Sequence, residues 1–310
     1  MKDITNTGVS GEETAVALGI FDGVHRGHRR VLEKAFSHSE LKKAIFTFNT
    51  HTVDSKGKDY KMLITDSFKK TLLSRAGADY IYSPDFYKLK TMPAEDFARD
   101  ILKGRLGAKV AVCGEKFRFG HNALGDSDAL IRYGKKYGFD VEIVERLDDN
   151  GTRISSSLIR KLVSEGEIVQ ANRLLGYNYG YCLEVIHGNE IGRTWDFPTI
   201  NQQIPQGLIL PRFGVYVSCV HIGESRYVGV TNIGVKPSVK KDIKPLAETY
   251  IVGFEGDLYG QEIELELLEF VRAERKFDSF DELRNEIKRN TEYAKKAYFK
   301  YVFTKGTWNT

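Results

Sequence analysis

The chain has 310 residues, of which 41% are hydrophobic and 28% are charged, and its formal net charge is +4. At about 150 residues per domain this length allows two domains, and the composition excludes a wholly disordered chain. No apolar run approaches the ~18 residues of a membrane-spanning helix, and the N-terminus lacks the apolar core of a secretory signal. The three cysteines, Cys113, Cys182 and Cys219, are too few and too scattered for a disulfide framework or a zinc site. Without such a span, signal or cysteine framework, we expect a cytoplasmic protein without a membrane partner. Because the basic residues are not concentrated, we expect no nucleic-acid partner; the oligomeric state stays open.

Residues 15–175 alternate between short apolar runs and segments with helical spacing. The apolar runs, which predict strands, lie at 15–20, 44–48, 80–82, 110–113 and 141–144. Helical spacing predicts helices at 28–36, 68–75, 94–102, 127–137, 156–164 and 168–175. Strands that alternate with helices predict an α/β domain with a mostly parallel sheet.

After Gly176 the pattern changes to short strands without intervening helices. These strands are expected at 181–186, 213–222, 227–230, 248–254 and 262–270, and the last of them alternates apolar residues with glutamates. Such a series predicts a small antiparallel β-barrel, and helical spacing at 279–299 predicts a C-terminal helix. We therefore expect one domain over residues 1–178 and a second over 179–310.

The first candidate site follows the first predicted strand, where residues 19–28 are GIFDGVHRGH. A strand, a glycine-containing turn and a helix start leave N–H groups free to bind an anion, and Gly23 and Gly27 permit a close approach. His25 and His28 can project to one side and donate hydrogen bonds to phosphate oxygens. The alternative is that one histidine caps the helix and the other is exposed. A metal site lacks a third ligand nearby.

Two later segments of this half offer polar and aromatic groups. Ser156, Ser157 and Arg160 open a predicted helix, and their hydroxyls and guanidinium suit a polyphosphate. The alternative for them is a serine N-cap and a surface arginine. Phe117 and Phe119 can form either a platform for a flat ring or an edge of the hydrophobic core.

The second candidate site begins with HGNEIGRTWDFPTIN at residues 187–201. Its glycines and arginine suit a polyphosphate, and Thr199 and Asn201 offer two oxygen ligands for Mg²⁺ on one face of an extended segment. Glu274 follows the last predicted strand and can accept a proton from an attacking hydroxyl. Simple alternation places Glu274 on the outer face, so a bulge or the strand's exit is needed to turn it inward. The alternative is an exposed carboxylate.

Together these segments resemble the bacterial bifunctional riboflavin kinase/FAD synthetase family, whose N-terminal half is an HxGH nucleotidyltransferase. The matching segments occur in the family's order: GIFDGVHRGH at 19–28, FTFNTH at 46–51, VCGEKFRFG at 112–120 with GD at 125–126, ISSSLIR at 154–160, HGNEIGRTWDFPTIN at 187–201, NIGVKPS at 232–238, DLYG at 257–260 and RAERKF at 272–277. The chain departs from the family's pattern at Thr50, Lys116 and Asp196.

The resemblance implies a Rossmann-like nucleotidyltransferase domain followed by a β-barrel kinase domain with a C-terminal helix. It implies that the barrel phosphorylates riboflavin with ATP to give FMN, the intermediate. The first domain then transfers AMP from ATP to FMN, which gives FAD and pyrophosphate, with Mg²⁺ at both sites. The alternatives are that only one activity is retained, or that the chain is a non-catalytic flavin-binding regulator.

The resemblance also implies roles for individual residues. The implied catalytic residues are His25, His28 and Glu274. ATP in the first domain is bound by Gly19, Phe21, Asp22, Gly23, Gly27, Ser156, Ser157 and Arg160. The flavin there is bound by His51, Phe117, Phe119 and Asp126. ATP in the barrel is bound by His187, Gly188, Gly192, Arg193, Pro198, Thr199 and Asn201. The metal ligands are Thr199 and Asn201. The flavin in the barrel is bound by Asn232, Arg272 and Phe277.

Overall fold

The computed structural model describes residues 1–49, 60–187, 198–235 and 245–302. By its internal contacts the chain divides into two compact units, Met1–Ser156 and Ser157–Thr310. In the part of the chain that is described, no helix is both long and apolar enough to cross a membrane. The following residues singled out above lie outside the described residues: Thr50, His51, Gly188, Gly192, Arg193 and Asp196.

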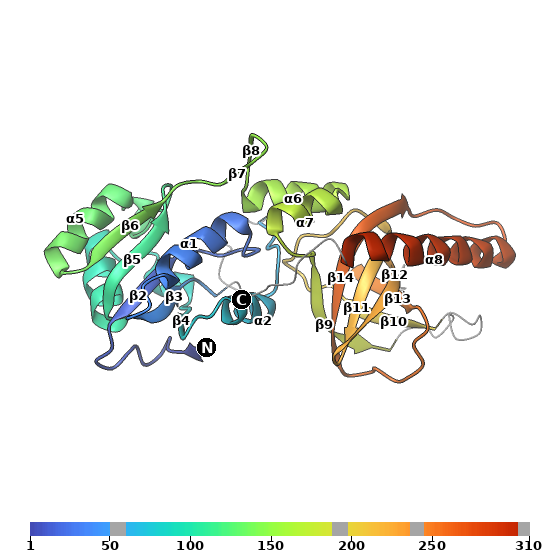
Figure 1. The fold of residues 1–310 in the computed structure, drawn as a ribbon, viewed down its shortest axis with the longest axis horizontal. Helices are drawn as coiled ribbons and strands as arrows, with labels where there is room; N and C mark the ends of the chain where they lie inside the picture. Colours follow the sequence, from blue (N-terminus) through green and yellow to red (C-terminus); the bar gives the residue numbers. More distant parts are fainter. Residues whose placement is uncertain (50–59, 188–197, 236–244, 303–310) are drawn as a thin grey trace. The chain divides into compact units, whose positions relative to one another are not determined.

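The first unit is built on a six-stranded parallel sheet in the order β1-β4-β3-β2-β5-β6 (Figure 1). All five residues of its central strand β2 are buried, as expected for a sheet covered on both faces. The sheet confirms the predicted α/β class, and the short strand β1 is an addition to it. The strands are β1 (Lys2–Asp3), β2 (Thr14–Leu18), β3 (Lys42–Phe46), β4 (Tyr80–Tyr82), β5 (Ala108–Gly114) and β6 (Asp140–Val144).

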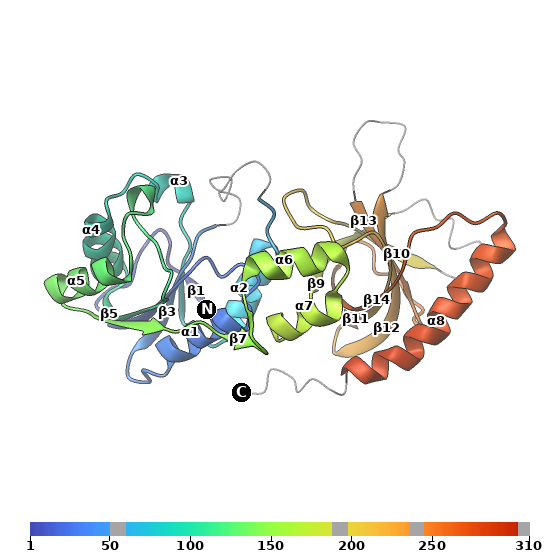
Figure 2. The same cartoon turned by 90° about the horizontal axis from the view of Figure 1, so that it is seen from above.

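Helices cover both faces of this sheet. Helix α1 packs against β2 and β5, while a π-helical segment, Phe97–Arg105, and α5 cover the opposite face (Figure 2). Val16 and Leu18 share a core with Phe97 and Ile101 on that second face. The helix predicted at 94–102 thus begins as α-helix and continues as π-helix. The α-helices are α1 (Arg26–Phe36), α2 (Asp66–Arg75), α3 (Phe86–Leu89), α4 (Ala94–Asp96) and α5 (Ser127–Tyr137).

Strand β2 marks the place where the strand order reverses, because β3 and β4 follow on one side of it and β5 and β6 on the other. In open parallel sheets ligands bind beyond the carboxyl ends of the strands at such a switch point. The segment after β2 carries the GIFDGVHRGH motif, and the segment after β5 carries Phe117 and Phe119. The topology therefore brings these two segments to the same edge of the sheet.

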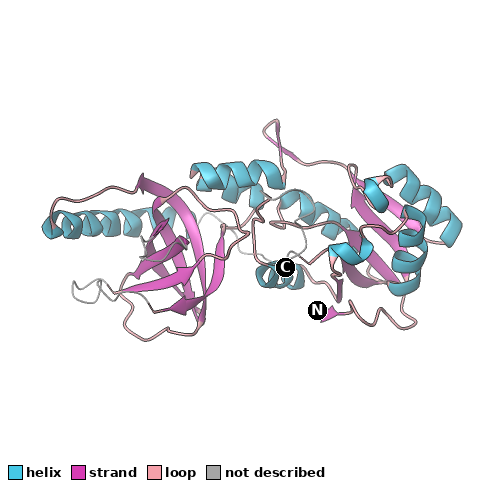
Figure 3. Ribbon diagram, turned by 180° about the vertical axis from the view of Figure 1, so that it is seen from behind, coloured by secondary structure: helices cyan, strands magenta, loops and turns pink. Residues whose placement is uncertain are grey.

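The second unit is a closed antiparallel barrel in the order β10-β13-β12-β11-β14-β9, with helix α8 lying along it (Figure 3). Ala294 and Tyr298 of α8 pack against Val217, Cys219 and Leu268 on the outer face. This confirms the predicted barrel and C-terminal helix. The elements are β9 (Gly180–Ile186), β10 (Thr199–Gln203), β11 (Gly214–Ile222), β12 (Ser225–Val235), β13 (Pro245–Ile251), β14 (Glu262–Ala273) and α8 (Phe280–Val302).

Helices α6 (Ser156–Glu165) and α7 (Ile168–Leu175) connect the sheet to the barrel. The buried side chain of Asn172 on α7 donates to the carbonyl oxygen of Leu267 at 2.8 Å and accepts from the amide of Tyr179 at 2.6 Å. Because of such contacts the two helices group with the barrel. The division between the two compact units therefore falls between Ser156 and Ser157 in the sequence. The change in sequence pattern predicts a domain boundary at 178/179. That boundary stays a prediction of which residues carry each activity.

Candidate active sites

The turn after β2 has an unusual backbone. Phe21, Gly23 and Val24 have φ angles of 52°, 79° and 35°, and this left-handed region is an outlier for a β-branched residue such as Val24. Val24 is fully buried, so packing holds the strained conformation. The hydroxyl of Thr47 donates to the carbonyl oxygen of Ile20 at 2.8 Å. Strain of this kind persists where the surrounding structure fixes it and is common at ligand-binding sites.

The two histidines of this turn stack on each other, with ring centroids 3.6 Å apart. His25 is the N-cap of α1, because its Nδ1 accepts from the amide of His28 at 3.2 Å. Gly27 leaves room for the His25 ring, which would lie only 3.2 Å from a Cβ at that position. The capping alternative is therefore correct for His25. His28 is not exposed: its Nδ1 is buried and has no hydrogen-bond partner among the described residues.

A buried cation influences this pair. Burial, His25 and Lys69 together hold the pKa of His28 well below its usual value, so the ring is neutral near pH 7, with one donor and one acceptor nitrogen. The side chain of Lys69 is completely buried on α2; its Nζ donates to the carbonyl oxygen of Phe48 at 2.8 Å and pairs with Asp66 at 3.1 Å. Burial lowers the pKa of Lys69, while Asp66 and Asp22 favour its charged form.

Sequence reasoning missed Lys69, because a lysine in a helix usually faces solvent. The available signal was its spacing: Lys69 lies three and four residues before Leu72 and Leu73, both of which are buried. Arg26 was also missed. Its guanidinium pairs with Asp149 of the hairpin β7 (Asp148–Asp149) and β8 (Thr152–Arg153) at 2.8 Å.

Some residues predicted to bind ATP are engaged within the protein. The carboxylate of Asp22 accepts from the amide of Leu63 at 2.9 Å, and so holds the segment before α2. The hydroxyl of Ser156 donates to the carbonyl oxygen of Asp22 at 2.9 Å. Ser157 and Arg160 belong to the second unit, where Nη2 of Arg160 lies 3.2 Å from the Ser157 hydroxyl. The structure thus places Asp22 and Ser156 at the turn as supports for its backbone.

A pocket of about 780 Å³ lies at the carboxyl ends of β2, β3 and β5. Gly19 lines it, and so does Lys116, one of the residues at which the chain departs from the family's pattern. Six phenylalanines also line the pocket: Phe46, Phe48, Phe86, Phe97, Phe117 and Phe119. The rings of Phe117 and Phe119 are parallel within 16° at 5.6 Å. Phe119 is part of the core and Phe117 packs against it, as the core alternative states; a role as a platform for a flat ring stays a prediction. The size and aromatic lining suit a flat ring system.

Asp126, predicted to bind the flavin, caps helix α5. Its carboxylate accepts from the amide of Ala129 at 2.9 Å and pairs with Arg118 at 3.1 Å. The bond from Ala129 holds the pKa of Asp126 below its usual value. Asp126 is not among the residues that line the pocket, although its partner Arg118 is.

In the barrel, the pairing of three strands aligns three polar residues. Asn201 of β10 lies opposite Glu248 of β13, which lies opposite Asn232 of β12, so the three share one face. Asn201 is 5% exposed, and its Oδ1 has no hydrogen-bond partner among the described residues. Thr199, two residues earlier on β10, shares the same face. A buried amide oxygen without a donor fits a hard cation ligand.

Glu248 was missed by the sequence reasoning, because it was placed at the start of a predicted strand rather than inside one. At the rim of the barrel, Pro198 precedes β10 and is exposed. His187, at the end of β9, stacks on Tyr259 of the DLYG segment with centroids 3.8 Å apart.

Glu274 lies just beyond the end of β14. Its Oε1 accepts from Nδ2 of Asn232 at 3.4 Å, and it lies so close to Gly234 that a Cβ there would be only 2.1 Å away. The pairing of β14 with β11 is irregular at two places, which breaks the simple alternation before Glu274. The Glu274 carboxylate is exposed, which agrees with the alternative of an exposed carboxylate. Asn232 and Gly234 of the NIGVKPS segment nevertheless position it.

Arg272 and Phe277, predicted to bind flavin in the barrel, lie together. The guanidinium of Arg272 is 5.6 Å from the centroid of the Phe277 ring and pairs with Glu286 of α8 at 3.0 Å. Arg275 lies over the same ring at 4.7 Å. Burial lowers the pKa of Arg272 although Glu286 opposes this. Helix α8 thereby fixes the orientation of the segment that follows β14.

Comparisons with known proteins match both halves of the chain. The FAD synthetase family model matches residues 9–158, and the riboflavin kinase family model matches residues 175–298. Bifunctional riboflavin kinase/FMN adenylyltransferases from Escherichia coli (strain K12) and Bacillus subtilis (strain 168) are 32% and 33% identical over 93% and 91% of this chain, and over 93% and 92% of their own lengths. A crystal structure described as a macrolide-efflux protein from Streptococcus pneumoniae matches with a TM-score of 0.83 and 28% identity, and the match covers 95% of this chain and 98% of that one.

Proposed function

This chain belongs to the bifunctional riboflavin kinase/FMN adenylyltransferase family, as its motifs predicted, and on that premise we propose which residues carry out each of its two activities. It is an enzyme that phosphorylates riboflavin with ATP to give FMN and then transfers AMP from ATP to FMN to give FAD. We assign the kinase to residues 179–310 and the adenylyltransferase to residues 1–178. Because both steps consume ATP, we infer a cytoplasmic location.

For adenylyl transfer, the central observation is the unpartnered Nδ1 of His28 in a turn fixed by packing. ATP binds against this turn, formed by Gly19, Phe21, Asp22, Gly23 and Gly27, and its phosphates also engage Ser156, Ser157 and Arg160. His28 donates to a phosphate oxygen as charge develops, and His25, held as the helix cap, keeps the neighbouring ring in place.

The pocket beside the turn receives the flavin. The isoalloxazine ring of FMN lies between the aromatic walls that include Phe117 and Phe119. Asp126 acts from outside the pocket through Arg118, and His51 is the further flavin-binding residue that we propose. The FMN phosphate then lies near the turn after β2, where in-line attack on the α-phosphorus of ATP requires it.

For phosphorylation, Glu274 accepts the proton of the ribityl hydroxyl that attacks ATP, and Asn232 orients its carboxylate. Asn232, Arg272 and Phe277 bind the flavin. ATP is bound by His187, Gly188, Gly192, Arg193, Pro198, Thr199 and Asn201. The unpartnered Oδ1 of Asn201 fits Mg²⁺, with Thr199 as the second protein ligand. When bound, Mg²⁺ supplies positive charge to the phosphate oxygens of ATP.

A direct test supplies riboflavin and FMN separately to the purified full chain with ATP and Mg²⁺, and separates the products by chromatography. We expect FMN and then FAD from riboflavin, and FAD from FMN. Conversion of FMN alone would show that only the adenylyltransferase is retained. No product from either substrate would refute the enzymatic assignment and favour a flavin-binding regulator.

A further inference from the structure

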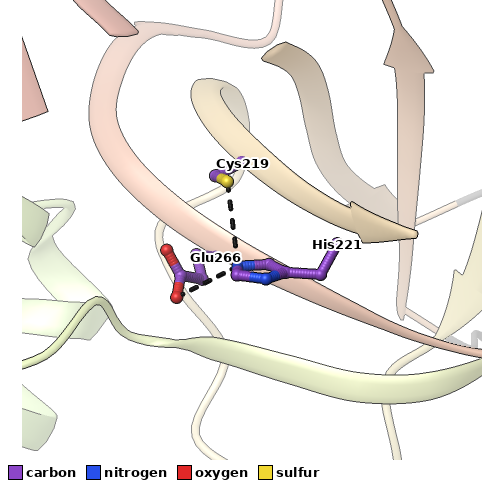
Figure 4. A group of neighbouring side chains, drawn as sticks. All are labelled: Cys219, His221 and Glu266. Atoms are coloured by element: carbon purple, nitrogen blue, oxygen red, sulfur yellow. Dashed lines mark hydrogen bonds and ion pairs between the residues drawn. The ribbon is translucent and has the colours of Figure 1, made fainter. Parts of the chain in front are cut away.

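Three side chains with metal-binding atoms converge on the outer face of the barrel (Figure 4). Cys219 and His221 are two residues apart on β11, so they share a face, and Glu266 on β14 is paired directly with Cys219. The Sγ atom of Cys219 lies 3.7 Å from Nε2 of His221, and the same Nε2 lies 3.3 Å from Oε1 of Glu266. One sulfur, one nitrogen and one oxygen atom therefore face a common point.

Two of the three separations between these atoms are those of a tetrahedral zinc site. With Zn–S near 2.3 Å and Zn–N and Zn–O near 2.0 to 2.1 Å, tetrahedral angles place sulfur and nitrogen about 3.6 Å apart, and nitrogen and oxygen about 3.3 Å apart. The distances of 3.7 and 3.3 Å between the donor atoms match these values closely. All three donor atoms lie within 4.8 Å of one another, so modest movement of the side chains lets one ion contact all three.

Neighbouring groups hold these side chains in place. Nδ2 of Asn178 donates to Oε2 of Glu266 at 2.8 Å, which leaves Oε1 directed at His221. The hydroxyl of Tyr298 on α8 lies 3.6 Å from the sulfur atom. Hydrogen bonds from such outer groups to metal ligands are a regular feature of built metal sites. Cys219 is 1% exposed, whereas the side chains of His221 and Glu266 are each 21% exposed, so an ion can enter from that side.

We propose that Cys219, His221 and Glu266 bind one divalent ion of the zinc class, with a water molecule as the fourth ligand. The ion joins β11 to β14 beside α8 and so stabilises the barrel. The thiolate distinguishes this site from the all-oxygen Mg²⁺ ligands Thr199 and Asn201, because soft ligands select zinc and its neighbours over magnesium. Counting cysteines argued against a zinc site, but ligands on two strands leave no signal in sequence spacing.

The test uses the full chain, freed of metal with a chelator and titrated with Co²⁺ as a spectroscopic probe for Zn²⁺. We expect one equivalent to bind with a sulfur-to-cobalt charge-transfer band and the visible bands of four-coordinate cobalt. Zn²⁺ should abolish both, and a large excess of Mg²⁺ should not. Cys219→Ser should remove the sulfur band and weaken binding at least tenfold, and Asn178→Ala should weaken binding about tenfold. Cys182→Ser, a change at another barrel cysteine, should leave the spectrum unchanged.

The absence of a sulfur-to-cobalt band in the wild-type chain would overturn the proposal and leave an ion pair between His221 and Glu266 only. A band that persists in Cys219→Ser, or disappears in Cys182→Ser, would also overturn it. The wild-type titration decides the question even if a variant folds poorly. Because no readout depends on flavin chemistry, failure here and failure of the proposed enzymatic activities are distinguishable.

Discussion

The two candidate sites obtain their geometry in different ways. In the first unit, packing fixes the groups: Val24 is buried with a positive φ, His25 is used as a helix cap, and Lys69 has no exposed surface. In the barrel, strand register aligns Asn201, Glu248 and Asn232, and Glu274 lies exposed beyond a strand end. Substitutions of the buried groups in the first site should therefore alter folding together with activity, whereas a substitution of the exposed Glu274 should alter activity alone.

One of the two largest expected effects is the loss of FAD formation in His28→Ala. Removal of one donor to a developing charge typically costs about 10²- to 10³-fold in rate, so initial rates of FMN to FAD should fall by that factor. FMN formation from riboflavin should stay at the wild-type rate. An equal loss in both steps would contradict the assignment of activities to separate halves.

Glu274→Ala should produce the reverse pattern. Loss of a general base typically slows a reaction by about 10²- to 10⁴-fold, so FMN formation should drop while FAD formation from supplied FMN is unaffected. Because this side chain is exposed, the melting temperature should not change. Gly234→Ala is the matched probe, since its Cβ would displace the carboxylate, and it should lower kcat of the kinase step. A kinase rate unaffected by Glu274→Ala would rule out its role as the base.

Lys69→Met tests whether the buried cation does more than support the fold. Its loss removes the ion pair with Asp66 and the hydrogen bond to the carbonyl oxygen of Phe48, which should cost about 3 kcal/mol of unfolding free energy. Urea unfolding followed by circular dichroism should show the loss, while FMN formation from riboflavin should stay at the wild-type rate. We also expect FAD formation to slow about tenfold; an unchanged rate in folded protein would restrict Lys69 to a structural role.

Acid should weaken the first unit through His28. Its folded pKa lies well below the ordinary 6.5, so below pH 6.5 the unfolded state takes up a proton that the folded state does not. This contribution to stability is therefore fully present above pH 6.5 and is lost as the pH falls. Urea unfolding at pH 7.5 and 5.5 should show a smaller pH dependence for His28→Gln than for the wild type. The same pH dependence in both would exclude His28 as the group responsible.

The smallest expected effect is that of Asp126→Ala. Loss of the α5 N-cap should cost about 1 kcal/mol of stability, measured by urea unfolding. The KM for FMN should rise only a few-fold, because Asp126 lies outside the pocket lining and acts on it through Arg118. A large rise in KM with unchanged stability would instead support direct contact between Asp126 and the flavin.

The sequence predicted most of the elements, because period-2 and helical patterns report which face of each element is buried. It did not predict β1, a two-residue strand without a pattern of its own. The sequence also could not predict the surroundings of Glu274, because the irregular pairing of β14 depends on its partner strand β11. Motif resemblance located His25 and His28. The conformation of the turn decides that His25 caps the helix, while Nδ1 of His28 has no hydrogen-bond partner among the described residues. The burial of Lys69 could have been predicted from its spacing to Leu72 and Leu73, but the residue was overlooked because of its charge.

The closed order of the barrel strands has a consequence for aggregation. Every strand from β9 to β14 has two neighbours, although β9 and β10 pair at two positions only, so the described part of the barrel has little open strand edge for a foreign strand. The six-stranded sheet, by contrast, ends at β1 and β6, and only the two-residue β1 is short enough to discourage strand addition. Self-association of partly unfolded chains should therefore begin at β6.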